Sequence, residues 1–282
     1  MTQLKYDTLG LLPALAADLF SNKEALYFKG SRWTFIEFSE SVDRVAKALL
    51  ALGIKPGNKV ALWMMNCPEW LFIMYATAKI GAILVPLNTR YRSSDVAYAV
   101  NQSDSILWIF QASSGPVDFL SMVQSNVQSL PNKNFNKLKN LVVFSPTVHS
   151  DFLSWNDMLD AGKKINDAEL YERSLNVNPE DTFLIAYTSG TTGDPKGVMH
   201  RHNLIQNTRD RIARLKITEH DVIINSLPLF HLYAYGEGAI TSILTGARQV
   251  LMETFDASEN LRLIEDEKVT IIHGFDTHYK DM

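Results

Sequence analysis

Cysteine, basic clusters and long apolar runs are scarce in this sequence, and each scarcity excludes a class of protein. A single cysteine, Cys67, among 282 residues rules out an intramolecular disulfide and fits a reducing compartment. Acidic residues outnumber lysines and arginines, 31 to 27, so a nucleic-acid partner is not indicated. No run is long enough to span a bilayer, and residues 1–20 make a poor secretory signal because Pro13 interrupts them. We expect a cytoplasmic protein, with peripheral membrane contact left open and the oligomeric state not indicated.

Two common nucleotide-binding signatures are also missing. A Walker P-loop needs G-x-x-x-x-G-K-[ST], but Lys196 follows Pro195 and precedes Gly197. The G-x-G-x-x-G fingerprint of dinucleotide-binding folds does not occur either. These absences disfavour a P-loop ATPase or kinase.

The sequence does contain a loop rich in hydroxyls and glycines directly after an apolar run at residues 183–186. The members of this loop are Thr188, Ser189, Gly190, Thr191, Thr192, Gly193, Lys196 and Gly197. Glycines let backbone N–H groups approach an anion, while the hydroxyls and the ammonium add donors and positive charge. A buried strand that leads into such a loop commonly holds polyphosphate in α/β proteins. The alternative is a surface loop made of ordinary turn-forming residues.

Strands and helices alternate along the chain in two series, at about residues 20–145 and 176–282. Thr34 and Glu37 form a capping box that predicts a helix, and Pro68 predicts the first turn of another, which ends before Gly81. Residues 111–139 are polar and predict a surface excursion with one short helix. We expect a later helix to begin near Gly236. Two βα series predict an α/β fold of two packed, mostly parallel sheets.

The segment from Tyr187 to Gly197 resembles the signature Y-T-S-G-T-T-G-x-P-K-G of the adenylate-forming (AMP-binding) enzymes. That superfamily contains acyl-CoA synthetases, luciferases and peptide-synthetase adenylation domains. N-C-P-E-W at residues 66–70 and L-P-L-F-H at 227–231 are similar to further core motifs of these enzymes. The resemblance runs from about residue 20 to the end and is nearest to the acyl-CoA synthetases, or fatty-acid–CoA ligases.

The resemblance implies that a carboxylic acid, most fittingly a fatty acid, reacts with ATP to give an acyl-adenylate, which then passes to coenzyme A. It also implies the ATP-binding residues, which are Thr188, Ser189, Gly190, Thr191, Thr192, Gly193 and Lys196. Thr191 would in addition contact Mg²⁺, and His231 would lie beside the substrate carboxylate or gate its entry. Two alternatives remain, a non-catalytic nucleotide- or acyl-binding module and an enzyme that loads a carrier protein.

The sequence departs from the family's pattern after residue 231. No Y-G-x-T-E motif, which holds adenine and Mg²⁺ in the family, occurs in it, and neither does the mobile C-terminal domain. We therefore expect residues 1–282 to be the N-terminal portion of the AMP-binding domain, truncated and incomplete as an enzyme.

Other candidate residues have a structural interpretation beside a functional one. Tyr233, Tyr235, Gly236 and Gly238 either line an acyl pocket or allow close helix packing. Glu237 could contact a polar substrate group, but we expect an exposed glutamate at a helix start. His200 and His202 do not form a metal site, because their spacing does not place both rings on one helix face. Cys67 is expected to be a buried small hydrophobic group.

Overall fold

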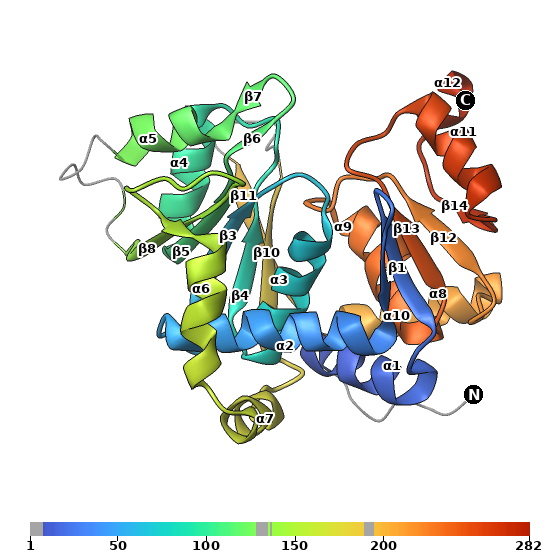
Figure 1. Ribbon diagram of the computed structural model, residues 1–282, viewed down its shortest axis with the longest axis horizontal. Helices are drawn as coiled ribbons and strands as arrows, with labels where there is room; N and C mark the ends of the chain where they lie inside the picture. The colour runs from blue at the N-terminus through green and yellow to red at the C-terminus, as the bar shows by residue number, and fades with distance from the viewer. Residues whose placement is uncertain (1–7, 128–134, 136, 189–194) are drawn as a thin grey trace.

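Two β-sheets lie side by side in the computed structural model, which describes residues 8–127, 135, 137–188 and 195–282 (Figure 1). The order of the first sheet is β11 (Lys196–Arg201), β10 (Thr182–Thr188), β4 (Ile83–Pro86), β3 (Lys59–Trp63), β5 (Ser105–Gln111), β8 (Asn140–Phe144) and β9 (Leu153–Ser154). The order of the second is β14 (Ile271–Ile272), β12 (Val222–Asn225), β13 (Arg248–Leu251), β1 (Glu24–Phe28) and β2 (Ser31–Thr34).

Parallel pairing dominates both sheets. In the described residues, only β1 with β2 and β10 with β11 pair antiparallel within them. This confirms the predicted α/β fold with two packed, mostly parallel sheets. Each sheet takes strands from both βα series, because β1 pairs with β13 and β10 pairs with β4. The chain therefore crosses twice between the sheets, which ties them into one body.

Helices cover and separate the sheets, with α2 along the lower side of the view and α3 between the sheets (Figure 1). The α-helices are α1 (Leu12–Phe20), α2 (Phe35–Ala51), α3 (Pro68–Lys79), α4 (Ser93–Gln102), α5 (Phe119–Val127), α6 (Trp155–Ala161), α7 (Asp167–Leu175), α8 (Leu204–Leu215), α9 (Leu232–Ala234), α10 (Thr241–Thr245), α11 (Ala257–Asp266) and α12 (Asp276–Asp281). Short 3₁₀ turns span Leu9–Leu11 and Gly162–Lys164, and a π-helical segment spans Tyr235–Ile240.

The two helix starts predicted from capping signals are confirmed. The Thr34 hydroxyl accepts a hydrogen bond from the Glu37 N–H at 3.2 Å, and the Glu37 carboxylate accepts one from the Thr34 N–H at 2.8 Å. These two bonds satisfy N–H groups that the first turn of α2 leaves unpaired. Helix α3 begins at Pro68 as predicted, and Gly81 follows it with φ of 74°. A positive φ is readily adopted by glycine, so the chain can turn sharply there.

The structure differs from the expectations in three places. Strand β11 begins at Lys196, which the sequence placed in a loop, and the small hairpin of β6 (Ser113–Ser114) and β7 (Val117–Asp118) was not predicted. The helix expected near Gly236 begins earlier, at Leu232, and widens into the π-helical segment. A Cβ on Gly238 would lie 2.1 Å from the amide nitrogen of Asn225. Gly238 therefore allows its helix to pack closely against Asn225. The predicted start near Gly236 is wrong because the glycines there permit packing and do not mark the helix start.

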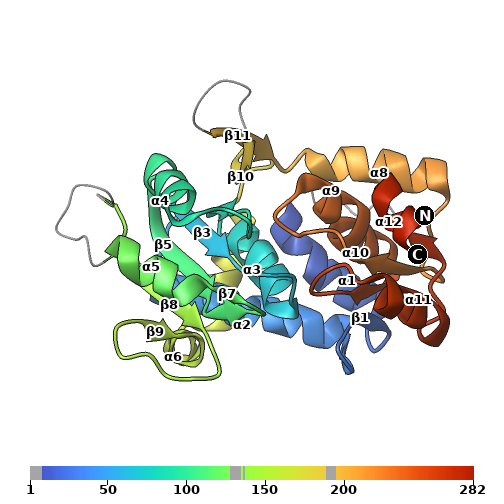
Figure 2. The same ribbon diagram turned by 90° about the horizontal axis from the view of Figure 1, so that it is seen from above.

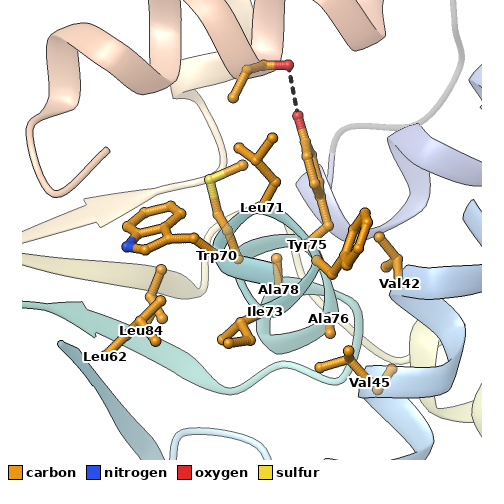
Figure 3. Packing of buried hydrophobic residues seen from close by; sticks show 14 of the residues in the cluster. Val42, Val45, Leu62, Trp70, Leu71, Ile73, Tyr75, Ala76, Ala78 and Leu84 are labelled. Carbon is orange, nitrogen blue, oxygen red and sulfur yellow. Dashed lines mark hydrogen bonds between the residues drawn. The ribbon is translucent and has the colours of Figure 1, made fainter. Parts of the chain in front are cut away.

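Helix α3 is buried on all sides and joins the two sheets (Figure 3). On one side it packs against Leu62 and Leu84 of β3 and β4. On the other side Trp70 packs against Tyr235, with ring centroids 5.4 Å apart, and the Tyr75 hydroxyl donates to the Ala239 carbonyl at 2.9 Å. A helix that is apolar all round has to be covered on every face, so α3 forms the common core of both sheets.

A buried histidine anchors the first described residues. His202 is 1% exposed, its ring stacks on Phe183, and its Nδ1 accepts the Leu9 N–H at 3.1 Å. Burial lowers the pKa of His202 to about 4, so the ring is neutral at pH 7.

Within the described ranges no group of three or more His, Cys, Asp and Glu side chains could hold a metal ion. The same part of the chain has no helix long and apolar enough to cross a bilayer.

Replacement of His202 should change how stability depends on pH. The unfolded state takes up a proton near the ordinary histidine pKa, whereas folded His202 resists protonation until about pH 4. Its neutral form therefore stabilises the fold fully above pH 6.5 and progressively less as the pH falls toward 4. We expect His202→Asn to reduce the loss of unfolding free energy between pH 7 and 4.5 by up to about 2.5 kcal/mol. Urea denaturation at both pH values measures this.

The matched control is His220→Asn, because His220 is an exposed histidine. The unfolding free energy of His220→Asn should fall more between pH 7 and 4.5 than that of His202→Asn, because His202 is intact in the control. An equal pH dependence in the wild type and in His202→Asn would contradict the assignment of a lowered pKa to His202.

Candidate functional site

The β10–β11 hairpin presents the two ends of the hydroxyl- and glycine-rich loop. Thr188, the last residue of β10, pairs with Lys196, the first residue of β11, and both side chains are exposed. The predicted ATP ligands Ser189, Gly190, Thr191, Thr192 and Gly193 lie outside the described residues. The predicted contact of Thr191 with Mg²⁺ lies outside them as well. Figure 2 shows the hairpin at the edge of the seven-stranded sheet, where the chain continues into α8.

The strand that leads into this loop is buried, as the apolar run predicts. Phe183 and Leu184 are almost fully covered, and β10 lies between β4 and β11 in the sheet. Tyr187 fixes the hairpin to α4, because its hydroxyl donates to the Ala99 carbonyl at 3.2 Å. A rigid strand therefore holds one exposed hydroxyl opposite one exposed ammonium, a donor set suited to an anion.

His231 ends a turn that follows β12. Its N–H donates to the Pro228 carbonyl at 3.0 Å, and it occupies the N-cap position of α9. The side chain is exposed on one side and lies against the Phe230 ring, with centroids 4.9 Å apart. Partial burial and the positive charge of Arg90 lower the pKa of His231. The imidazole is therefore neutral at pH 7 and can both donate and accept a hydrogen bond.

Arg90 is a candidate residue that the sequence analysis missed. It lies in the loop after β4, where its N–H donates to the Asn88 side-chain oxygen at 2.9 Å. The Asn88 carbonyl in turn accepts the Trp63 indole N–H at 3.0 Å. Both Arg90 and His231 follow carboxyl ends of parallel strands, the usual place for ligands in α/β folds. The position of Arg90 after a strand end was the signal that could have found it. The sequence does not show, however, that the loop after β4 lies near the loop after β12 of the other sheet.

Glu237 is buried, so the prediction of an exposed glutamate is wrong. It is 8% exposed, and its carboxylate lies 2.9 Å from the Arg211 Nε of α8 and 3.6 Å from the His273 Nδ1. The helix begins at Leu232, which turns Glu237 toward α8 instead of toward solvent. Burial raises the pKa of Glu237, and Arg211 opposes that change. Burial and Arg211 also lower the pKa of His273 to about 4, so this imidazole is neutral.

The remaining pocket candidates separate into buried and exposed residues. Tyr235 is fully buried against Trp70, and Gly236 would bring a Cβ within 3.1 Å of the Arg211 guanidinium. Tyr233 is 37% exposed and packs beside the His273 and Phe275 rings. Cys67 is buried as expected, and burial raises the pKa of its thiol. The lining of an acyl pocket by Tyr233, Tyr235, Gly236 and Gly238 stays a prediction.

Comparison with known proteins gives the family. A profile of the AMP-binding enzymes, described as "AMP-binding enzyme", matches residues 14–282. The chain belongs to the AMP-binding enzyme family. This confirms the resemblance found at the loop and at the two further motifs.

Individual proteins of known sequence or structure are also similar to this chain. The chain is 32% identical to the acyl-CoA synthetase-like protein YngI of Bacillus subtilis in an alignment that covers 99% of this chain and 53% of that protein. It is 30% identical to the long-chain-fatty-acid–CoA ligase FadD13 of Mycobacterium tuberculosis over 85% of this chain and 44% of that protein. The solved anthranilate–CoA ligase AuaEII, in complex with anthranoyl-AMP, superposes with a TM-score of 0.85 at 26% identity, over 96% of this chain and 50% of that one.

These relatives are about twice as long as the matched region. The chain spans about half the length of the curated relatives it matches, which agrees with the expectation of an N-terminal portion.

The effect of Arg90 on His231 can be measured directly. Arg90→Gln removes a positive charge that opposes protonation, so we expect the pKa of His231 to rise toward the ordinary histidine value. Titration of the His231 ring by NMR measures this, with His231→Gln used to assign its signal. Arg92→Gln removes an exposed arginine two residues away and should leave the pKa of His231 unchanged. If both variants have the same small effect, Arg90 does not act locally.

Proposed function

We propose that this protein activates a carboxylic acid with ATP, forming an acyl-adenylate and pyrophosphate, and then transfers the acyl group to coenzyme A. The observation that carries the proposal is the β10–β11 hairpin, which holds Thr188 and Lys196 opposite each other at the base of the family's signature loop. Both FadD13 and AuaEII are named as CoA ligases, which supports the same acceptor here.

The first step brings two anions together, so the protein has to offset negative charge and align the reactants. In this proposal Lys196 neutralises charge on the β- and γ-phosphates, while Thr188 donates a hydrogen bond to a phosphate oxygen. The loop ligands Ser189, Gly190, Thr191, Thr192 and Gly193 add donors, although they lie outside the described residues. Thr191 would hold in part the Mg²⁺ that accompanies ATP, and that ion would supply further positive charge to the phosphates.

His231 and Arg90 act on the carboxylate side. The neutral imidazole donates a hydrogen bond to the carboxylate and orients it toward the α-phosphorus. The Arg90 guanidinium contributes positive charge to the same region, as its effect on the pKa of His231 indicates. The lowered pKa of His231 favours the neutral imidazole at neutral pH, which keeps its hydrogen-bonding role constant there.

The acid is proposed to be a fatty acid and the location to be the cytoplasm. FadD13 is named for long-chain fatty acids and AuaEII for anthranilate, so the family accommodates both aliphatic and aromatic acids. The single buried cysteine supports a reducing compartment.

Acid-dependent exchange of labelled pyrophosphate into ATP tests the proposal on the protein purified from its source. We expect exchange only when an acid is present, with palmitate, octanoate and anthranilate compared at equal concentration and Mg²⁺ supplied. Thioester formation with coenzyme A or with an acyl carrier protein then identifies the acceptor. ATP binding without exchange would instead support a non-catalytic binding module, and ATP hydrolysis without any acid would contradict the ligase chemistry.

Lys196→Ala should lower the exchange rate by about 100-fold, because a preorganised charge that stabilises the reacting phosphates is lost. Its unfolding free energy should stay within about 0.5 kcal/mol of the wild type, since the side chain is exposed. Lys55→Ala, at another exposed lysine, is the matched control and should retain full activity. Unchanged exchange in Lys196→Ala would remove the hairpin from the mechanism.

A further inference from the structure

Asn66 makes three buried hydrogen bonds that link the two sheets. It lies in the turn between β3 and α3 and is 4% exposed. Its side-chain nitrogen donates to the Leu227 carbonyl at 2.9 Å and to the Met252 carbonyl at 3.0 Å. Its side-chain oxygen accepts the Leu229 N–H at 2.8 Å. Both amide hydrogens and the oxygen are therefore used, and few other side chains offer this combination.

The partners of Asn66 lie just beyond the carboxyl ends of strands in the other sheet. Leu227 follows β12 and Met252 follows β13, and the Met252 N–H donates to the Asn225 carbonyl at 3.0 Å. Asn66 itself follows β3 of the seven-stranded sheet. One amide therefore fixes the spacing of the two sheets at the edge where ligands bind in α/β folds.

Two of the three bonds hold the turn that leads to His231. They reach the carbonyl before Pro228 and the N–H after it, and Leu227 and Leu229 are both buried. The next bond along the chain, from the His231 N–H to the Pro228 carbonyl, closes the turn. The position of the His231 backbone is thereby tied to the start of α3, which carries the core between the sheets.

We propose that Asn66 is a positioning residue of the carboxylate site, holding the 227–231 turn so that His231 faces the loops of the seven-stranded sheet. The role of His231 at the carboxylate rests on the proposed function. The placement of the 227–231 turn by Asn66 rests only on the three hydrogen bonds. Loss of the amide leaves three buried backbone groups unpaired, and the turn moves to restore their hydrogen bonds. A small displacement of an orienting group lowers the rate of the chemical step more than it weakens ATP binding.

Asn66→Ala tests the proposal, with Asn260→Ala as the matched control. Asn260 is 1% exposed and its amide contacts the Met252 sulfur at 3.4 Å, so it is a second buried asparagine next to the same residue. Within the described part of the chain, its side chain has no hydrogen bond to the 227–231 turn. Both variants are expected to be less stable than the wild type, which separates stability from positioning.

The first measurement is the NMR titration of the histidine rings. In Asn66→Ala, His231 should leave its partly buried position near Arg90, so its pKa should rise toward the ordinary histidine value. In Asn260→Ala it should remain as in the wild type. His202, buried elsewhere, should keep its low pKa in both variants and so report that the fold is intact.

The second measurement is steady-state exchange kinetics in the active protein. We expect Asn66→Ala to lower kcat by about 10- to 100-fold with little change in the KM for ATP. Asn260→Ala should leave kcat unchanged. Asn66→Asp, which keeps the size and the acceptor but loses both donors, is the second variant if Asn66→Ala does not fold.

The outcomes separate the two proposals. A wild type without acid-dependent exchange contradicts the proposed function alone, because the titration still tests the position of His231. An unchanged pKa of His231 in Asn66→Ala, or an equal change in Asn260→Ala, overturns the positioning role. Unfolding of both Asn66 variants while Asn260→Ala folds also overturns it, since Asn66 would then govern the whole fold and not the turn.

Discussion

The burial of helix α3 between the two sheets is the constraint on which the rest of the structure depends. Its residues contact β3 and β4 on one side and the π-helical segment on the other, through the Trp70–Tyr235 rings and the Tyr75 hydroxyl bond (Figure 3). A helix without a polar face has no stable place at a surface. The two sheets are therefore held at a fixed distance, and their strand ends meet along one edge.

That meeting of strand ends creates the candidate site. Arg90 follows β4 in one sheet, and His231 follows β12 in the other, yet the charge of Arg90 influences the imidazole. The β10–β11 hairpin adds Thr188 and Lys196 for an anionic ligand. The three bonds of Asn66 lie at the same junction, so the packing that stabilises the protein also aligns the groups that we assign to ATP and to the carboxylate.

Local signals predicted the elements well, and the errors arose where tertiary packing intervened. The capping box at Thr34 and the proline at the start of α3 act within one turn, so their sequence signal is complete. The burial of Glu237 depends instead on α8, which presents Arg211 to the carboxylate. A glutamate at a helix start is expected to be exposed, and the sequence does not show that an arginine of another helix faces it.

The sequence alone determined the α/β class, the helix limits set by caps and glycines, and the family, through a loop signature whose order is improbable by chance. These properties follow from contacts between residues close in the chain or from residue identity itself. Only the tertiary structure decided that β1 and β2 join the second sheet, that Arg90 accompanies His231, and that Asn66 spans both sheets. Those relations join residues that are 140 or more positions apart, and hydrophobic periodicity does not encode which distant strand ends will meet.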